Sequence, residues 1–304
     1  MPSLTDSLRR WRRALKARAP YVRRRHYRIL QRKYDGLIDA LHSSVTAAGD
    51  APLALRKALP PALAGEVCLF VTHAPQPVLK THVVHHIEHL LRAGWQVVLI
   101  VNTDLAPQDI VIDPGLQARL AGVLVRANRG FDFGAWAHAL GLCDRGAWTL
   151  LLLVNDSVVG PLDAGDFDRM MQRARGSDAD LVGLTRNDAD IVHLQSYFLL
   201  FNRRALDSAV FGKLMRGALN FPDKGQVVDF YEKRLTRLLA GDGLRVCALF
   251  PALADGSGSG DMLGSWEALR ATGFPYVKTR VLQELGADPR MRAVRAAGCV
   301  DGQV

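Results

Sequence analysis

A lone carboxylate follows directly on an apolar stretch near the middle of the chain. Leu150 to Val154 has the length and composition of a buried strand, and Asn155-Asp156-Ser157 comes straight after it. Oxygen ligands suit Mg²⁺ or Mn²⁺, and such a cation neutralises the charge of a leaving diphosphate. Asp156 is the single carboxylate of the three, while Asn155 and Ser157 offer weaker oxygen donors. The segment therefore predicts a diphosphate site in which a divalent cation is a candidate cofactor.

Other side chains could complete or replace that metal site. Asp132 or His193 could join Asp156 as ligands, which makes Asp156 and His193 the candidate metal residues. Alternatively, backbone amides and Arg129 could hold the phosphates without a cation. The residue types leave both arrangements open.

Polar residues also collect where other predicted strands end. His73, Asn102 and Asp104 follow two such strands, and the segment 128–132 follows a third. Asn, Asp and Ser are common in turns and helix caps, which is the simpler explanation for any one strand end. Because several ends carry them, and ligands of open α/β sheets bind at the carboxyl ends of the strands, the pattern favours a shared crevice.

The elements that must position these residues alternate between strand and helix. Strands are expected at 67–73, 96–101, 122–125, 148–154, 180–184, 193–201 and 246–250, and helices at 81–93, 134–142, 167–175 and 227–240. A further helical stretch from 266 to 285 is interrupted by Gly273-Phe-Pro-Tyr-Val-Lys278. This rhythm predicts an α/β fold, a mostly parallel sheet covered by helices on both faces.

The N-terminal part differs in charge from the rest. Residues 1–35 hold twelve Lys or Arg and two Asp, whereas the whole chain of 304 residues has a net charge of +9. Leu4, Leu8, Trp11 and Leu15 form one apolar helical stripe within this basic segment, as in an interfacial membrane helix. An anionic membrane surface is the expected partner of residues 1–35; nucleic acid is not expected, because aromatic residues are not interleaved as stacking platforms. A solvated or self-packing helix pair is the alternative.

Four segments follow from these patterns. We expect a basic amphipathic arm at 1–48, a Pro/Ala-rich linker at 49–65, the α/β domain at 66–290 and a tail at 291–304. No apolar run approaches the roughly 18 residues of a membrane span, and no apolar signal-peptide core follows the basic N-terminus.

One short motif points to different chemistry. His85-His-Ile-Glu88-His89 matches the pattern H-x-x-E-H, in which two His on one helix face bind zinc and the Glu is the base. A third ligand cannot be assigned, and helix-packing or surface histidines are the favoured explanation of the motif. A zinc hydrolase is thus a minor alternative.

Four blocks of the sequence resemble the rhamnan synthesis protein F family. They are Asn128-Arg-Gly-Phe-Asp-Phe-Gly-Ala-Trp136, Leu152-Leu-Val-Asn-Asp-Ser-Val-Val-Gly-Pro161, His193-Leu-Gln-Ser-Tyr-Phe198 and Gly273-Phe-Pro-Tyr-Val-Lys278. The similarity covers roughly residues 66–285. It implies a GT-A-like, Rossmann-type glycosyltransferase of bacterial surface-polysaccharide assembly, often a rhamnosyltransferase that uses a dTDP-sugar such as dTDP-rhamnose.

The resemblance also gives roles to the candidate residues. In GT-A enzymes an acidic motif that ends the fourth strand grips the metal and the diphosphate, and Asn155-Asp156-Ser157 occupies that place with one carboxylate fewer. The donor site would then consist of His73, Asp104, Asn128, Arg129, Gly130, Asp132, Asn155 and Ser157, with Asp156 as a catalytic residue.

The acceptor side needs a general base that deprotonates a hydroxyl group. Glu232 lies in a context similar to the base segment of inverting GT-A enzymes, although a solvated glutamate paired with Arg would look the same. Asp229, Asp255 and Asp261 are the other candidates. The residues expected to border the acceptor are His193, Gln195, Tyr197 and Lys278.

The expected function is transfer of a sugar, such as rhamnose, from a nucleotide-sugar to a lipid-linked glycan. The product would be a surface polysaccharide or lipopolysaccharide, and the enzyme would sit peripherally on the cytoplasmic face of the inner membrane. A catalytically silent carbohydrate-binding or scaffold protein on the same fold is the alternative.

Overall fold

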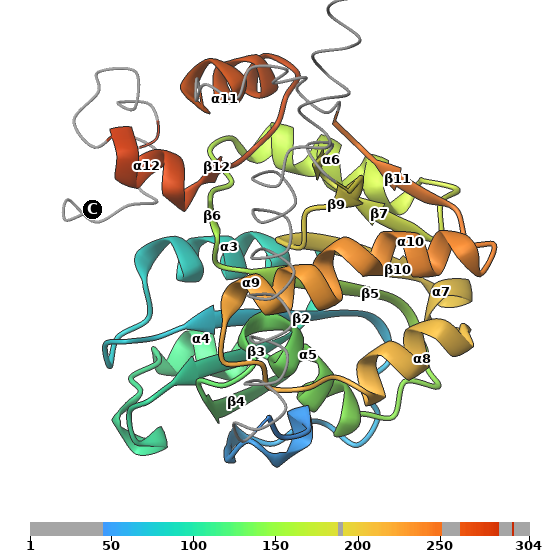
Figure 1. The fold of residues 1–304 in the computed structure, drawn as a ribbon. Helices are drawn as coiled ribbons and strands as arrows, with labels where there is room; N and C mark the ends of the chain where they lie inside the picture. Colours follow the sequence, from blue (N-terminus) through green and yellow to red (C-terminus); the bar gives the residue numbers. More distant parts are fainter. Residues whose placement is uncertain (1–44, 188–190, 251–261, 286–293, 295–304) are drawn as a thin grey trace, which may run out of the picture. The chain divides into compact units, whose positions relative to one another are not determined.

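An eight-stranded sheet runs through the described part of the chain, with the strand order β1-β4-β3-β2-β5-β10-β7-β11 (Figure 1). Six strands run in one direction, and β1 and β10 run the opposite way. The strands are β1 (Leu53–Lys57), β2 (Gly65–His73), β3 (Gln96–Thr103), β4 (Gly122–Ala127), β5 (Trp148–Asn155), β7 (Leu181–Gly183), β10 (Phe198–Asn202) and β11 (Val246–Ala248). The expected mostly parallel sheet is therefore confirmed.

The computed structural model describes residues 45–187, 191–250, 262–285 and 294. Residues from Thr46 onward form one compact unit. The basic arm lies outside the described residues except for its last four positions, and so do Asp255, Asp261 and nearly all of the predicted tail. Among the described helices, none combines the length and the apolar character that a bilayer crossing requires.

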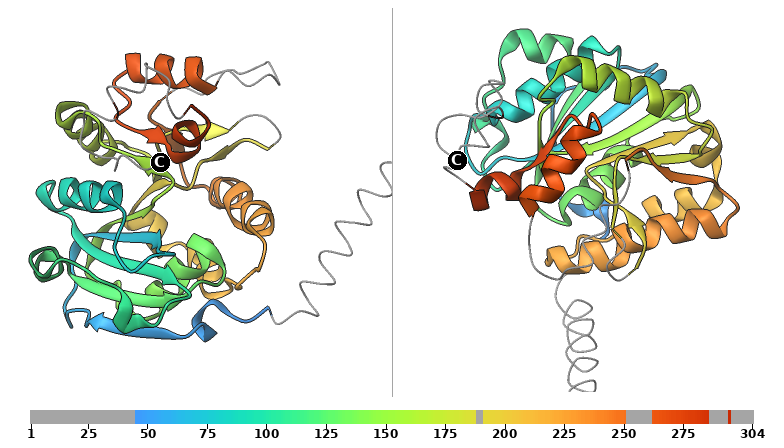
Figure 2. Two further views of the ribbon diagram at one scale, coloured as in Figure 1. Left: turned by 90° about the vertical axis from the view of Figure 1, so that its left-hand side faces the viewer. Right: turned by 90° about the horizontal axis from the view of Figure 1, so that it is seen from above.

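Helices cover both faces of the sheet, as expected (Figure 2). On one face, α3 (Thr81–Arg92), α4 (Pro114–Arg119) and α6 (Ala164–Arg175) share a core with every second residue of the central strands, such as Cys68 and Phe70. On the other, α5 (Phe131–Gly141) packs on β2 and β3, and the indole of Trp136 donates to the Leu69 carbonyl. α7 (Arg203–Asp207) and α8 (Ala209–Arg216) follow there.

Two segments differ from the sequence expectation. Part of the predicted linker 49–65 forms β1, which pairs antiparallel with β4 at the edge of the sheet. The expected strand 193–201 is divided in two: β9 (His193–Leu194) pairs with β8 (Arg186–Asn187), and β10 starts at Phe198. The chain leaves the strand because the amide of Gln195 bonds to Thr185 and that of Ser196 to Glu232.

The second half also refines two predicted helices. The expected helix 227–240 comprises α9 (Lys224–Val227), a π-helical turn η3 (Val228–Glu232) and α10 (Lys233–Gly241). The stretch 266–285 is interrupted as expected: α11 (Met262–Ala271) and α12 (Thr279–Leu285) flank β12 (Val277–Lys278). β12 pairs with β6 (Val158–Val159), directly after the Asn-Asp-Ser segment (Figure 1).

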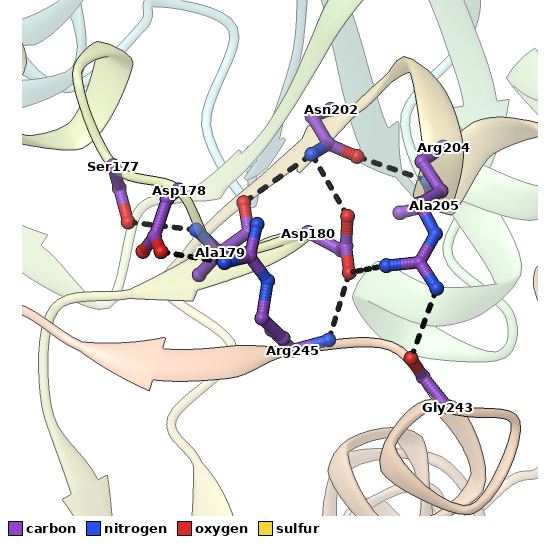
Figure 3. Close-up of polar contacts among 9 residues, drawn as sticks. All are labelled: Ser177, Asp178, Ala179, Asp180, Asn202, Arg204, Ala205, Gly243 and Arg245. Atoms are coloured by element: carbon purple, nitrogen blue, oxygen red, sulfur yellow. Dashed lines mark hydrogen bonds and ion pairs between the residues drawn. The ribbon is translucent and has the colours of Figure 1, made fainter.

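A buried carboxylate ties the amino-terminal edge of the sheet together (Figure 3). Asp180, 1% exposed, comes just before β7 and accepts from the Arg245 amide (2.8 Å), the Asn202 amide group (3.0 Å) and Arg204 (2.9 Å). Burial alone would raise the pKa of Asp180, but these bonds and the two arginine charges lower it. The network therefore joins β7, β10 and β11 by charge-assisted hydrogen bonds.

Candidate active site

A pocket of about 590 Å³ opens at the carboxyl ends of the central strands. This size is within the usual range for small-molecule sites. The strands β2, β3 and β5 supply its floor, and the first turns of α3, α5, α9 and α12 supply its walls. The described lining residues are Val71, His73, Lys80, Thr81, His82, Asn102, Asn128, Phe131, Asp132, Asn155, Asp156, Ser157, Val159, Lys224, Thr279, Leu282 and Gln283.

Asp156 is held at the pocket by three donors on one oxygen. Its Oδ2 accepts from the Thr72 hydroxyl (2.7 Å), the His73 amide (3.2 Å) and the Lys80 ammonium (2.7 Å). Thr72 and His73 end β2, which neighbours β5 in the sheet, so parallel pairing brings these groups to one carboxylate. The pocket therefore contains an ion pair between Lys80 and Asp156.

Asn155 and Ser157 form a tight turn around that carboxylate. Asn155 Oδ1 accepts from the amide (3.1 Å) and the hydroxyl (2.6 Å) of Ser157, as in an Asx turn. The Ser157 carbonyl accepts from the amide (2.9 Å) and hydroxyl (3.1 Å) of Thr279. This second contact brings the C-terminal Gly273–Lys278 block beside the Asn-Asp-Ser block.

Asp132 is the second carboxylate of the pocket. Its Oδ2 accepts from Asn155 Nδ2 (2.8 Å), and its Oδ1 accepts from the Phe133 amide (3.0 Å). Burial raises the pKa of Asp132 from 3.8 to about 6, and the negative charge of nearby Glu232 adds to this rise. A carboxylate whose pKa lies near neutral pH is suited to proton transfer.

A strained loop fixes Asp132 in this place. Gly130 has φ of 70° and a side chain there would meet Asn220 Oδ1 at 2.6 Å, while Phe131 also has a positive φ of 53°. Buried Arg126 donates to the Arg129 carbonyl and to Asn220. A positive φ at a bulky residue costs about 1–3 kcal/mol, and such strain is found mainly at functional sites.

Glu232 lies in a neighbouring polar group rather than in the described pocket lining. It accepts from the hydroxyl and amide (3.4 Å) of Ser196, and its Oε1 is 3.3 Å from His193 Nε2. His193 Nδ1 donates to the Ile191 carbonyl.

The residues expected to border an acceptor gather beside Glu232. Thr185 donates its hydroxyl to Gln195 Oε1 (2.6 Å) and lies 2.6 Å from the Tyr197 hydroxyl. Burial raises the pKa of Tyr197. The Lys278 ammonium lies 5.9 Å from the centre of the Tyr197 ring, within cation–π range. These residues, like Glu232, lie outside the described lining of the pocket.

The structure brings most of the expected donor residues together. His73, Asn128, Asp132, Asn155 and Ser157 line the pocket with Asp156, whereas Asp104, Arg129 and Gly130 are outside its described lining. Gly130 instead gives room to Asn220, and Arg129 offers its carbonyl to Arg126.

Two lysines of the pocket, Lys80 and Lys224, were not anticipated from the sequence. Lys80 is the N-cap residue of α3. A cation is unfavourable at the positive end of a helix dipole. A lysine just before a predicted helix is therefore a signal of a functional role that the sequence offered. Lys224 gave no such signal, because it meets the pocket through long-range packing.

The described residues do not form a divalent-metal site on their own. No group of three or more His, Cys, Asp or Glu is placed to hold a metal among them. Asp156 lines the pocket but the other expected ligand, His193, does not, and Lys80 already pairs with Asp156. The donor set is therefore a poor fit for Mg²⁺ or Mn²⁺.

The zinc motif is also divided among other contacts. His85 Nε2 lies 2.9 Å from the Pro161 carbonyl and must donate to it. His89 Nδ1 bonds to the His85 carbonyl, and Glu88 pairs with Arg119. The three side chains therefore serve helix packing and a surface ion pair.

The chain is similar to parts of two curated bacterial proteins. The chain is 28% identical over 198 residues to the uncharacterized protein y4gN of Sinorhizobium fredii, which covers 62% of this chain and 49% of that protein. It is 29% identical over 132 residues to virulence protein VirA of Vibrio anguillarum, covering 41% of each. The chain thus spans about half or less of the length of these curated relatives.

Solved structures give a more distant likeness. A candidate nucleotide-diphospho-sugar transferase of Desulfovibrio desulfuricans G20 aligns over 77% of this chain and 98% of its own, with 12% identity and a TM-score of 0.37. A 4-diphosphocytidyl-2C-methyl-D-erythritol synthase of Anaerococcus prevotii aligns over 68% and 98%, with 12% identity and a TM-score of 0.35.

The family comparison covers most of the residues that line the pocket, although Val71, His73, Lys80, Thr81 and His82 precede the matched segment. The model of the family described as rhamnan synthesis protein F matches residues 97–292, which include β3, β5, α5, α9 and β12. The match extends over more than half of the chain. The chain therefore belongs to the rhamnan synthesis protein F family.

Proposed function

We propose that this protein is a glycosyltransferase that binds a nucleotide-sugar in the pocket at the carboxyl edge of the sheet. The observation that carries the proposal is the meeting of two carboxylates, Asp132 and Asp156, with two ammonium groups, Lys80 and Lys224, in one pocket of about 590 Å³. A sugar diphosphate needs cations for its phosphates and a carboxylate for the proton released on transfer. Membership of the rhamnan synthesis protein F family supports the same reaction class.

The proposed step is a direct displacement at the anomeric carbon of the donor sugar. An acceptor hydroxyl oxygen attacks this carbon, and the bond between the carbon and the diphosphate oxygen breaks. The nucleoside diphosphate leaves with the bonding electrons, and the hydroxyl proton passes to a carboxylate. Positioning of the two reactants in one pocket supplies much of the rate enhancement.

Asp132 is the base that the geometry favours. It lines the pocket, and its pKa of about 6 leaves it mostly ionised at neutral pH yet more basic than an ordinary aspartate. Glu232, the base expected from the sequence, accepts a hydrogen bond from Ser196, and its Oε1 lies 3.3 Å from His193 Nε2. We assign Glu232 a supporting part, in which its charge raises the pKa of Asp132.

The donor and acceptor are proposed from the family rather than from the pocket. We propose a deoxyhexose donor such as dTDP-rhamnose, and a growing lipid-linked surface polysaccharide or lipopolysaccharide as the acceptor. Residues 1–35 would attach the enzyme to the anionic cytoplasmic face of the inner membrane, through their basic and apolar side chains.

Hydrolysis of the donor tests the reaction class without a known acceptor, because water can replace the acceptor hydroxyl. The purified chain is incubated with dTDP-rhamnose, UDP-glucose and GDP-mannose, and release of nucleoside diphosphate is measured. One donor should be cleaved, and Asp132→Asn should reduce cleavage by about 10²- to 10⁴-fold while donor binding remains. Asp109→Asn, an exposed aspartate outside the described lining, is the matched control.

One result would count against this function, and another would reassign the base. If no nucleotide-sugar is bound or cleaved, a scaffold or carbohydrate-binding role becomes the better explanation. If Asp132→Asn retains full cleavage and Glu232→Gln loses it, the reaction class stands but Glu232 is the base.

A further inference from the structure

Lys80 pairs with Asp156, the residue at which the sequence predicts a divalent cation. The Lys80 ammonium is 2.7 Å from Asp156 Oδ2, and this oxygen also accepts from Thr72 and His73. The side chains of Lys80 and Asp156 are 38% and 18% exposed, so the pair is accessible from the pocket yet partly shielded from water. A lysine is thus already bound to the single carboxylate of the Asn-Asp-Ser segment.

The neighbouring oxygen atoms are also engaged. Asn155 Oδ1 accepts two bonds from Ser157, and the two oxygens of Asp132 accept from Phe133 and Asn155. A divalent cation at Asp156 would lie close to the Lys80 ammonium, which would repel it, and would compete with these bonds for its ligands. Mg²⁺ binds through oxygen ligands, and among the described residues no group of three or more His, Cys, Asp or Glu is placed to hold a metal.

The same pocket carries positive groups that suit a diphosphate. An ammonium has three donors, so Lys80 keeps two for phosphate oxygens while it bonds to Asp156. Lys224 also lines the pocket, and its charge acts on Asp132. The first turn of the eleven-residue helix α5 reaches the pocket at Phe131 and Asp132, and the positive end of its dipole favours an anion there.

We propose that Lys80, with Lys224 and the N-terminus of α5, binds the diphosphate of the donor without a divalent cation. This inference rests on the proposed function, since it concerns how the same pocket binds the donor. Asp156 is then a positioning residue, which holds the Lys80 ammonium against the phosphates. The role that a metal ion has in other nucleotide-sugar enzymes is carried by a side chain of this protein.

Binding of dTDP, UDP and GDP to the full chain, measured by isothermal titration calorimetry, tests the proposal. The titrations are run in EDTA and again with Mg²⁺ or Mn²⁺. At least one nucleotide should bind with the same affinity, within about threefold, in all three buffers. Lys80→Ala should weaken its binding by about 10- to 100-fold, the loss expected for a charge-assisted bond to phosphate, and Lys80→Arg should recover part of it. Lys213→Ala, on the exposed surface of α8, is the control.

The role of Asp156 has its own measurement. Asp156→Asn should weaken nucleotide binding in the parent but have no effect in the Lys80→Ala background, because its contribution passes through Lys80. A purely structural role would give the same loss in both backgrounds and would contradict the positioning role.

The other outcomes are distinct. Binding that Mg²⁺ or Mn²⁺ strengthens tenfold or more, and that Lys80→Ala leaves unchanged, would overturn the metal-independent site while keeping the proposed function. Absence of binding for dTDP, UDP, GDP and their sugars in every buffer would overturn the proposed function itself, and this inference with it.

Discussion

Asp180 and Asp132 lie at opposite edges of the same sheet, and their surroundings are nearly inverse. Asp180 stands before β7 at the amino edge, where Arg204, Asn202 and the Arg245 amide all donate to it. Asp132 stands at the carboxyl edge, where an amide group and one backbone amide donate to it and Glu232 lies nearby. The first carboxylate is buried and bonded to an arginine; the second is half-buried, and both of its donors among the described residues are neutral.

The pKa shifts express this difference. At Asp180 burial is outweighed by hydrogen bonds and arginine charges, and the pKa is lowered. At Asp132 burial and the charge of Glu232 outweigh the two hydrogen bonds, and the pKa of Asp132 rises to about 6. Ionised Asp180 therefore stabilises the folded state at neutral pH, whereas ionised Asp132 lowers its stability. A protein keeps the second kind of carboxylate where it serves chemistry.

The largest effect on stability should come from the paired carboxylate. Asp180→Asn replaces a carboxylate that accepts from three donors, at a side chain that is 2% exposed, by a neutral amide. The free energy of unfolding, measured in urea at pH 7, should therefore fall by about 2–3 kcal/mol. Because the pKa of Asp180 is lowered in the folded state, the parent's advantage holds above the ordinary aspartate pKa near 4 and declines as pH falls below it.

Asp178 provides the matched control for that measurement. It pairs with Arg245 in the same network, but its side chain is 87% exposed. Exposed pairs contribute little, so Asp178→Asn should change the free energy of unfolding by less than about 0.5 kcal/mol. Equal losses for Asp178→Asn and Asp180→Asn would mean that burial is not what distinguishes the network.

The alternation of predicted strands and helices along the sequence was enough to predict the central part of the fold. Apolar runs such as 96–101 and 148–154 are buried on both sides in parallel strands, and they leave a continuous hydrophobic signal. The edge strand β1 was missed because an edge strand needs fewer apolar residues, and its Pro/Ala-rich flanks favoured a linker. The division between β9 and β10 depends on side-chain bonds between distant segments, such as Ser196 with Glu232, which no local pattern encodes.

The candidate site could be predicted in part for the same reason. Polar residues at strand ends, such as His73 and Asn155, follow from topology, because parallel strands bring their carboxyl ends to one edge. Lys80 reaches Asp156 by packing across more than 70 residues, and Thr279 reaches the neighbouring Ser157 through the β6–β12 pairing. Neither the ion pair at Asp156 nor the raised pKa of Asp132 is visible in residue order.

A smaller effect of opposite sign is expected at the unpaired carboxylate. Asp132→Asn should raise the free energy of unfolding by on the order of 1 kcal/mol at pH 7, because it removes a buried charge and keeps an acceptor for Asn155. The folded-state pKa of about 6 is above the ordinary value of 3.8, so the gain should be absent below about pH 4 and grow as pH rises through 6. Urea unfolding at pH 4 and pH 7.5 measures it; a loss of stability at pH 7.5 would contradict the assignment.

The smallest effect should come from the charge that acts on Asp132 from a distance. Glu232→Gln removes a negative charge, so the pKa of Asp132 should fall from about 6 toward, but not as far as, 3.8. Donor cleavage requires ionised Asp132 in the proposed step, and its acidic limb should therefore move to lower pH, with the rate at pH 8 changing little. A pH profile of nucleoside diphosphate release measures this shift. Since burial is the larger cause of the raised pKa, most of the displacement should remain in the variant. Loss of cleavage at every pH would instead make Glu232 the base, and an unmoved limb would mean that Glu232 does not act on Asp132.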